Sequence, residues 1–187
     1  MKFSFRKYIL FSCALCLPYV VHAEPAYLSK TIRIVFTKAG LPTVNENRIP
    51  ANWTLKTLSG ETLTLHQLKG KVVFLNFWAT WCPPCRAEMP SMEVLYRRFH
   101  GKGLEMIACD VMENSAEVAK FMRDNKLSFP ALLDSTGQVS NQYGVQGIPA
   151  TFIIDREGRI VSHVVGSKNW NTPAITDAFE ALLQYGR

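Results

Sequence analysis

Residues 71–90 (KVVFLNFWATWCPPCRAEMP) constrain the fold more than any other part of the chain. They open with an apolar run at 72–78, rich in β-branched and aromatic residues, which is typical of a strand covered on both faces, as in a parallel sheet. Pro83 directly follows Cys82, and proline suits the first position of a helix because its φ is preset and it lacks an N–H. The segment therefore predicts a buried strand that passes straight into a helix, with a CxxC pair at the junction.

This CxxC pair has the position of a redox centre. Cys82 would be the N-cap of the helix, where unpaired N–H groups and the helix dipole favour a thiolate. Thiols at such helix starts have pKa values of roughly 3.5–7.5, against about 8.5 for a free thiol. Cys82 is thus the candidate nucleophile. Cys85 lies within one turn, can close a disulfide with Cys82, and suits the resolving role because it would be the more buried of the two.

A CxxC pair is also half of a zinc site, but a structural zinc site needs about four Cys or His ligands, usually from two clusters. Outside the N-terminal segment the only further cysteine is Cys109, and the histidines are scattered singly. Redox chemistry is therefore favoured, and we expect neither a metal nor a cofactor. Cys109 ends an apolar run and is expected to be an inert core thiol.

Residues 1–23 predict a secretory signal peptide. Three basic residues precede an apolar stretch at 9–21, and residues 21–23 fit a small-x-small cleavage site. The stretch is short for a spanning helix, which needs about 20 residues, so cleavage is favoured over an uncleaved anchor. Cleavage would lower the formal net charge from +6 to +3, because it removes three basic and no acidic residues. We therefore expect no nucleic-acid partner.

The rest of the chain alternates strand and helix patterns. Residues 24–50 are expected to form an extension, with a weak strand pattern at 31–36 and a linker at 38–47. From residue 51 onward a hairpin around Gly60 comes first, and strands and helices then alternate, ending in a second hairpin and a closing helix at 172–185. This order predicts an α/β fold with a central mixed sheet flanked by helices.

The stretch NFWATWCPPCRAEMP resembles the active-site segment of the TlpA/ResA-like thiol-disulfide oxidoreductases of the thioredoxin superfamily. The resemblance includes Trp81, Glu88 and Pro90, and it continues from about residue 51 to the C-terminus. It implies a thioredoxin fold for residues 51–187, with an N-terminal β-hairpin and a central insertion at about 124–144. It also implies thiol–disulfide exchange, in which Cys82 attacks a target disulfide and Cys85 resolves the mixed disulfide.

Glu88 has two interpretations. Its spacing alone favours an exposed carboxylate on the helix surface near Arg86. The resemblance instead places it beside the cysteines, where a partly buried carboxylate with a raised pKa would exchange a proton with Cys85. Thioredoxins proper have a buried aspartate at the position of Asn76, which cannot titrate, so that proton transfer would fall to Glu88 or to water.

Four further residues are expected to contact substrate. By resemblance Pro149 is cis and faces the CxxC pair, although an X–Pro bond is cis in only about 5–6% of cases in folded proteins. The backbone of Ile148 would then pair with an extended substrate segment. Trp81 and Pro84 are expected to line the surface around Cys82.

The resemblance implies an exported protein-disulfide reductase, active in the periplasm, either soluble or tethered to the inner membrane by residues 8–21. Its substrates would be disulfide-containing exported proteins such as apocytochromes c during cytochrome c maturation. Its electrons would come from a membrane thiol donor of the DsbD/CcdA type. The alternatives are a disulfide oxidase or isomerase of the same fold, a peroxiredoxin-like peroxidase, and a copper-binding assembly protein in which His163 would have to serve as a ligand. The oligomeric state stays open.

Overall fold

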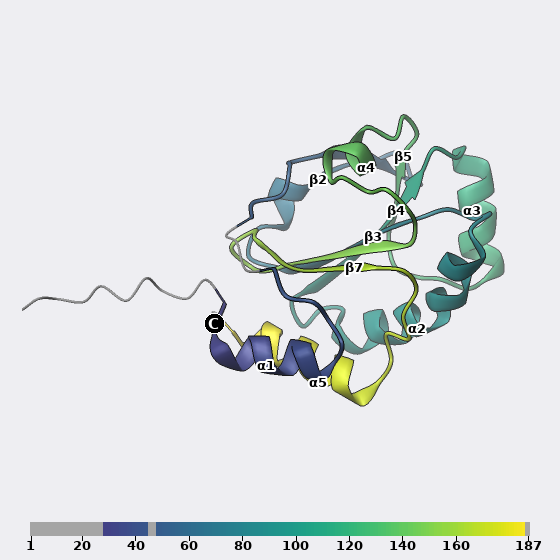
Figure 1. The fold of residues 1–187 in the computed structure, drawn as a ribbon. Helices are drawn as coiled ribbons and strands as arrows, with labels where there is room; N and C mark the ends of the chain where they lie inside the picture. Colours follow the sequence, from purple (N-terminus) through teal and green to yellow (C-terminus); the bar gives the residue numbers. More distant parts are fainter. Residues whose placement is uncertain (1–27, 45–47, 186–187) are drawn as a thin grey trace, which may run out of the picture.

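The computed structural model describes residues 28–44 and 48–185, so the predicted signal peptide at residues 1–23 lies outside the described part of the chain. Within these ranges seven strands form one mixed sheet in the order β2-β1-β5-β4-β3-β6-β7 (Figure 1). The strands are β1 (Thr54–Thr57), β2 (Thr62–Thr64), β3 (Val72–Trp78), β4 (Leu104–Val111), β5 (Ala131–Asp134), β6 (Ala150–Ile154) and β7 (Ile160–Val165). The predicted α/β class and thioredoxin-type mixed sheet are confirmed.

Strand β3 is the centre of the sheet, and every residue in it is buried. It runs parallel to β4, with Trp78 opposite Asp110, and antiparallel to β6, with Phe77 opposite Ala150. The C-terminal ends of β3 and β4 therefore meet the N-terminal end of β6 at one edge of the sheet. This edge carries the CxxC pair, Asp110 and Pro149.

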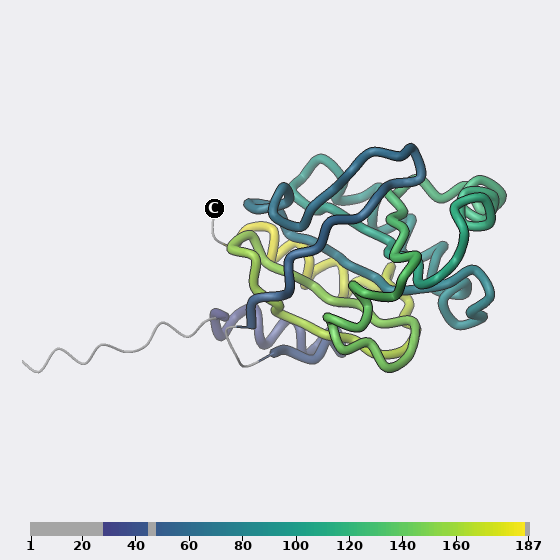
Figure 2. The backbone as a smooth tube through the Cα atoms, turned by 90° about the horizontal axis from the view of Figure 1, so that it is seen from above, coloured from purple at the N-terminus to yellow at the C-terminus, as the bar shows by residue number. Residues whose placement is uncertain are grey.

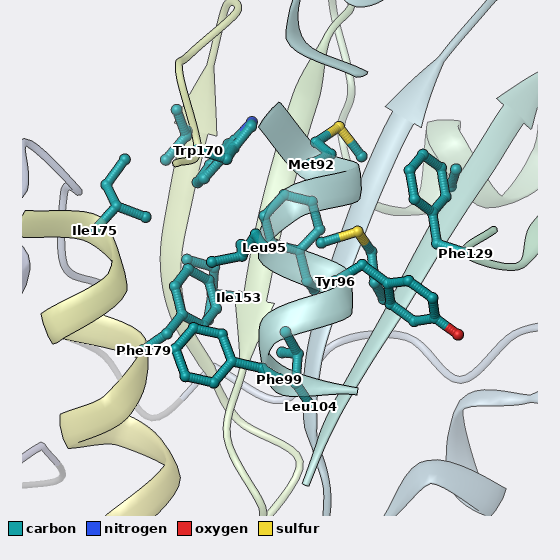
Figure 3. Close-up of a cluster of buried hydrophobic side chains, with 14 of the residues drawn as sticks. Met92, Leu95, Tyr96, Phe99, Leu104, Phe129, Ile153, Trp170, Ile175 and Phe179 are labelled. Carbon is teal, nitrogen blue, oxygen red and sulfur yellow. The ribbon is translucent and has the colours of Figure 1, made fainter. Parts of the chain in front are cut away.

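Helices cover both faces of the sheet. The larger core lies under α2 (Pro83–Phe99), together with α1 (Lys30–Lys38), α3 (Ser115–Asp124) and α5 (Pro173–Gln184). The other face packs on the short helix α4 (Gln138–Gln142) and is flanked by the 3₁₀ turn η1 (Leu65–Leu68). Figure 3 shows the larger core, in which side chains of α2 such as Leu95 and Phe99 meet Phe179 of α5.

The strand predicted at 31–36 is wrong, because these residues belong to helix α1. The β-branched residues there resemble a strand, but Ile32 and Phe36 are buried four positions apart on one helix face, whereas Ile34 is 45% exposed. The Ser29 side chain accepts a hydrogen bond from Ile32 N and caps the helix. Figures 1 and 2 show α1 lying beside α5.

The segment predicted as a linker at 38–47 does not leave the body of the protein in its described part. Leu41 is buried in the larger core, and Thr43 forms an isolated antiparallel bridge with Ser162 of β7. Val44 N donates a hydrogen bond to the carbonyl of Val161, which continues this pairing. Gly40 and Pro42 are typical of a linker, but the buried Leu41 and the pairing with β7 hold the segment against the sheet.

Candidate active site

Cys82 and Cys85 form a disulfide at the start of α2. Cys82 is the N-cap of the helix, and its Sγ accepts a hydrogen bond from Cys85 N at 3.3 Å. Pro83 takes the first helical position. Cys82 is 3% exposed and Cys85 is fully buried, so a substrate approaching from solvent meets Cys82 first.

The loop before β6 lies against this disulfide. The Ile148–Pro149 bond is cis, as the resemblance implied, and the carbonyl oxygen of Ile148 lies 3.8 Å from Cys82 Sγ. Pro149 is buried, and its carbonyl accepts a hydrogen bond from Gly166 N at 2.9 Å, which joins the loop to the end of β7. The structure thus brings Ile148 and Pro149 to the cysteine pair.

The other two residues expected to contact substrate lie on the surface beside Cys82. Trp81 is 66% exposed, which is unusual for so large an apolar side chain. Pro84 is also exposed, in the first turn of α2. Trp78, by contrast, is fully buried and packs against Phe121 of α3. The structure therefore leaves Trp81 and Pro84 accessible around the disulfide.

Glu88 is buried one turn beyond Cys85, at 2% exposure, so the exposed surface carboxylate that its spacing favoured is wrong. Its Oε1 accepts a hydrogen bond from Asn76 Nδ2 at 2.9 Å. Its Oε2 accepts hydrogen bonds from Lys168 N at 3.1 Å and from Trp170 Nε1 at 3.0 Å. Burial raises the pKa of Glu88 above its usual value, and these three hydrogen bonds offset part of that rise.

The residues that hold Glu88 were not predicted from the sequence. Trp170 precedes α5, and its ring meets Phe74 edge to face at a centroid distance of 4.7 Å. Figure 3 places this ring next to the upper turns of α2. Trp170 N also donates to Ser91 Oγ of α2 at 2.9 Å. No local pattern links this loop to α2, and only the packed structure reveals the contact.

Solvent has a route to Glu88. A surface hollow of about 340 Å³ is lined by Glu88 together with residues of α2 and of the loop after β7. These other lining residues are Ala87, Pro90, Ser91, Ser167, Lys168 and Asn169. A buried carboxyl that reaches such a hollow can exchange its proton with water and still remain shielded, which suits a group that transfers protons to a nearby thiol.

An acidic pair, Asp110 and Glu113, lies at the same edge of the sheet as the cysteine pair. Asp110 ends the buried part of β4 and is fully buried, with Oδ2 lacking a hydrogen-bond partner. Its Oδ1 accepts a hydrogen bond from Glu113 N at 3.2 Å. Burial, followed by the neighbouring Glu113 carboxylate, raises the pKa of Asp110 to about 8, and Asp134 adds to the rise. Burial alone would raise the pKa of Glu113, but the neighbouring Asp110 carboxyl and the two hydrogen bonds from Thr80 outweigh burial and lower it.

Replacing Asp110 with asparagine is expected to make the stability less dependent on pH. The folded state holds a proton on Asp110 up to about pH 8, whereas the unfolded chain releases it near pH 3.8. The contribution of Asp110 to the free energy of unfolding is therefore fully present below about pH 4, and it is lost as the pH rises to about 8. Urea unfolding between pH 4 and 9 should show a smaller decline for Asp110→Asn than for the wild type. Equal declines in the two proteins would contradict the assignment.

Within the described ranges, no group of three or more His, Cys, Asp or Glu side chains could hold a metal ion. His163 stacks on Phe152 with a centroid distance of 4.1 Å, and Phe152 belongs to the core on the opposite face from α2. Cys109 is buried on that same face as a free thiol, and burial raises its pKa well above the usual value. Neither residue joins the CxxC pair. The described part of the chain also contains no helix that is both long and apolar enough to cross a membrane.

A disulfide at a helix start, faced by a cis-proline loop at the edge of a thioredoxin-type sheet, defines the class of thiol-disulfide oxidoreductases. Residues 47–163 match the AhpC/TSA family. The thiol-disulfide oxidoreductase ResA of Bacillus subtilis is 40% identical over 129 residues, covering 69% of this chain and 72% of the relative. ResA of Halalkalibacterium halodurans is 44% identical over 133 residues, covering 71% and 74%.

Solved structures agree with this class. StoA from Bacillus subtilis has a TM-score of 0.60 at 28% identity, covering 74% of this chain and 99% of its own. A thiol:disulfide interchange protein of the thioredoxin family from Chlorobium tepidum has a TM-score of 0.64 at 26% identity, covering 74% and 97%. The chain belongs to the AhpC/TSA family and to the TlpA/ResA-like thiol-disulfide oxidoreductases. Its relatives are thiol-disulfide oxidoreductases, and this membership makes the chain a protein-disulfide reductase.

Proposed function

We propose that the protein is an exported reductant that uses its CPPC pair to reduce disulfides in periplasmic proteins, apocytochromes c among them, during cytochrome c maturation. The observation that carries the proposal is the pairing of Cys82, the more exposed sulfur of the disulfide and the neighbour of the Ile148 carbonyl, with a buried titratable Glu88 one turn beyond Cys85. Such a site can bind the main chain of an extended polypeptide at Ile148, and Glu88 can accept the proton that Cys85 must lose during exchange.

The reaction conserves electrons and protons. In the reduced protein the Cys82 thiolate attacks one sulfur of the target disulfide, and the other target sulfur leaves as a thiolate, which takes up a proton. Glu88 accepts the proton of Cys85, and the resulting thiolate attacks Cys82 Sγ. The second target sulfur leaves as a thiolate and takes up the proton from Glu88, which becomes ionised again, and the Cys82–Cys85 disulfide remains. The target gains two electrons, which the protein must recover from a separate donor.

The donor we propose is a membrane thiol protein of the DsbD/CcdA type, facing the periplasm. The signal-like sequence at residues 1–23 supports export, and the protein would work there either soluble or tethered by residues 8–21. An oxidising compartment keeps exposed thiol pairs oxidised, so a reductant there depends on such a donor.

The test is the direction of exchange with a defined substrate. The reduced protein is mixed with a disulfide-bonded CxxCH peptide, the haem-attachment sequence of c-type cytochromes, and product thiols are counted over time. We expect reduction to run nearly to completion, with formation of the Cys82–Cys85 disulfide. The oxidised protein mixed with the dithiol peptide is the control. Rapid oxidation of the peptide in that control would favour the disulfide oxidase instead.

A further inference from the structure

The turn that leads into Cys82 is held by a carboxylate from the loop after β4. Glu113 follows β4, and its Oε2 accepts a hydrogen bond from Thr80 N at 2.6 Å. Its Oε1 accepts a second hydrogen bond from Thr80 Oγ1 at 2.5 Å. Thr80 lies two residues before Cys82 and thirty-three residues before Glu113 in the chain. Both carboxylate oxygens are therefore committed to one residue of the active-site turn.

We propose that Glu113 is a positioning residue for disulfide exchange, which fixes the Thr80–Cys82 turn and so sets the approach of Cys82 Sγ to a target disulfide. Hydrogen bonds to an ionised acceptor are shorter and roughly twice as strong as neutral ones, and two of them on one residue set its orientation as well as its place. The inference rests on the exchange activity of the protein and not on its substrate or compartment.

The backbone that presents Glu113 is itself constrained. Met112 has a φ of 62°, a left-handed conformation that is uncommon for a residue with a side chain. Met112 N donates to the carbonyl of Asp134 at 3.1 Å, and Glu113 N donates to Asp110 Oδ1. Conformations of this kind persist where the surroundings over-determine them, and they cluster at functional sites. Here they turn the chain at the end of β4 so that Glu113 faces Thr80.

Asp110 supports the loop that carries Glu113, because its Oδ1 accepts the hydrogen bond from Glu113 N. The alternation of β4 places Asp110 on the same sheet face as Met106 and Ala108, which pack in the core under α2. A protonated Asp110 accepts from Glu113 N without setting a second full charge beside the Glu113 carboxylate. The pair therefore holds one negative charge, and that charge lies on the oxygens that bind Thr80.

The experiment compares Glu113→Ala, Glu113→Gln and the control Glu117→Ala in the full chain. Gln can still accept from Thr80 N through Oε1 and donate to Thr80 Oγ1 through Nε2, so it keeps the anchor without the charge. Glu117 is an exposed acid one turn further along, and its side chain does not bind the active-site turn. Each reduced protein is mixed with 5,5′-dithiobis(2-nitrobenzoate), and the pH profile of Cys82 alkylation by iodoacetamide is recorded alongside urea unfolding.

For Glu113→Ala we expect the second-order rate constant to fall about tenfold, within the hundredfold that a 1 Å misplacement can cost. Glu113→Gln should stay within about threefold of the wild type, and Glu117→Ala should match it. The proposal would be overturned if folded Glu113→Ala kept the wild-type rate, or if Glu113→Gln lost as much as Glu113→Ala. If Glu113→Ala does not fold, Thr80→Val removes one of the two hydrogen bonds and should lower the rate about threefold; an unchanged rate would then overturn the proposal.

Discussion

Serine at position 82 is expected to reduce disulfide exchange to the uncatalysed background, whereas serine at position 85 should trap the substrate. Cys82 is the sulfur nearest to solvent and lies beside the Ile148 carbonyl, so its loss removes the only attacking group of the pair. Without Cys85, which is fully buried behind it, the mixed disulfide cannot be resolved from within. Non-reducing electrophoresis and intact mass after mixing with a disulfide-bonded protein measure both outcomes.

Cys109→Ser is the matched control for these two variants. Cys109 is a buried free thiol on the opposite face of the sheet, and it should contribute nothing to exchange. A covalent adduct that forms with Cys82→Ser but not with Cys85→Ser would reverse the assigned roles. Loss of activity in Cys109→Ser, in a protein that remains folded, would show that exchange involves a third thiol.

Replacing Glu88 with glutamine is expected to slow resolution of the mixed disulfide about a hundredfold, the lower end of what a positioned general base contributes. Glu88 must be ionised to accept the Cys85 proton, and its pKa is raised by burial. The wild-type rate should therefore fall as the pH drops through that raised pKa. In the glutamine variant this inflection should disappear. Accumulation of the mixed disulfide in a single-turnover reaction, followed by acid quenching, measures the step.

Glutamine suits this test because the site can accommodate it. Its oxygen can accept from Trp170 Nε1 and Lys168 N, and its nitrogen meets Asn76, whose Oδ1 lacks a partner and can turn to accept. Alanine would leave Lys168 N and Trp170 Nε1 without their acceptor, whereas Asn76 Nδ2 would keep its hydrogen bond to Thr151 Oγ1. It should lower the free energy of unfolding by about 2 kcal/mol, at about 1 kcal/mol or more for each unpaired donor.

Glu93→Gln is the control for the Glu88 variant. Glu93 is a second buried acid on α2, bound by Arg97 and Ser128, and it lies away from the cysteine pair along the helix. Its replacement should leave the resolution rate unchanged. If both variants slowed resolution alike, the effect would come from altered packing of α2 and not from proton transfer by Glu88.

Much of the fold could be predicted from the sequence because its strongest signals are local. The strand at β3 and the helix after Pro83 follow from an apolar run and a well-placed proline, and the hairpins follow from turn residues such as Gly60. The cysteine pair was located in the same way. Its neighbour Pro149 needed the resemblance, since local preferences favour a trans bond.

The rest of the site depends on contacts between distant segments, which a single sequence does not display. Trp170 lies 82 positions from Glu88, and Glu113 lies 33 positions from Thr80. The β-branched residues of α1 favour a strand when read alone, but its packing against α5 makes the segment a helix. Spacing alone likewise left Glu88 on the surface, whereas the loop after β7 covers it.

The most direct test of the proposed reductant is the reduction potential of the Cys82–Cys85 pair, measured by equilibrating the protein with dithiothreitol and counting free thiols. A dedicated reductant should have a value near that of thioredoxin, about −270 mV. With a reduction potential near −270 mV, the pair could reduce most exposed disulfides after a donor has reduced the Cys82–Cys85 disulfide again. A value near −120 mV, typical of a strong oxidant, would contradict the proposal and favour disulfide formation as the role of this site.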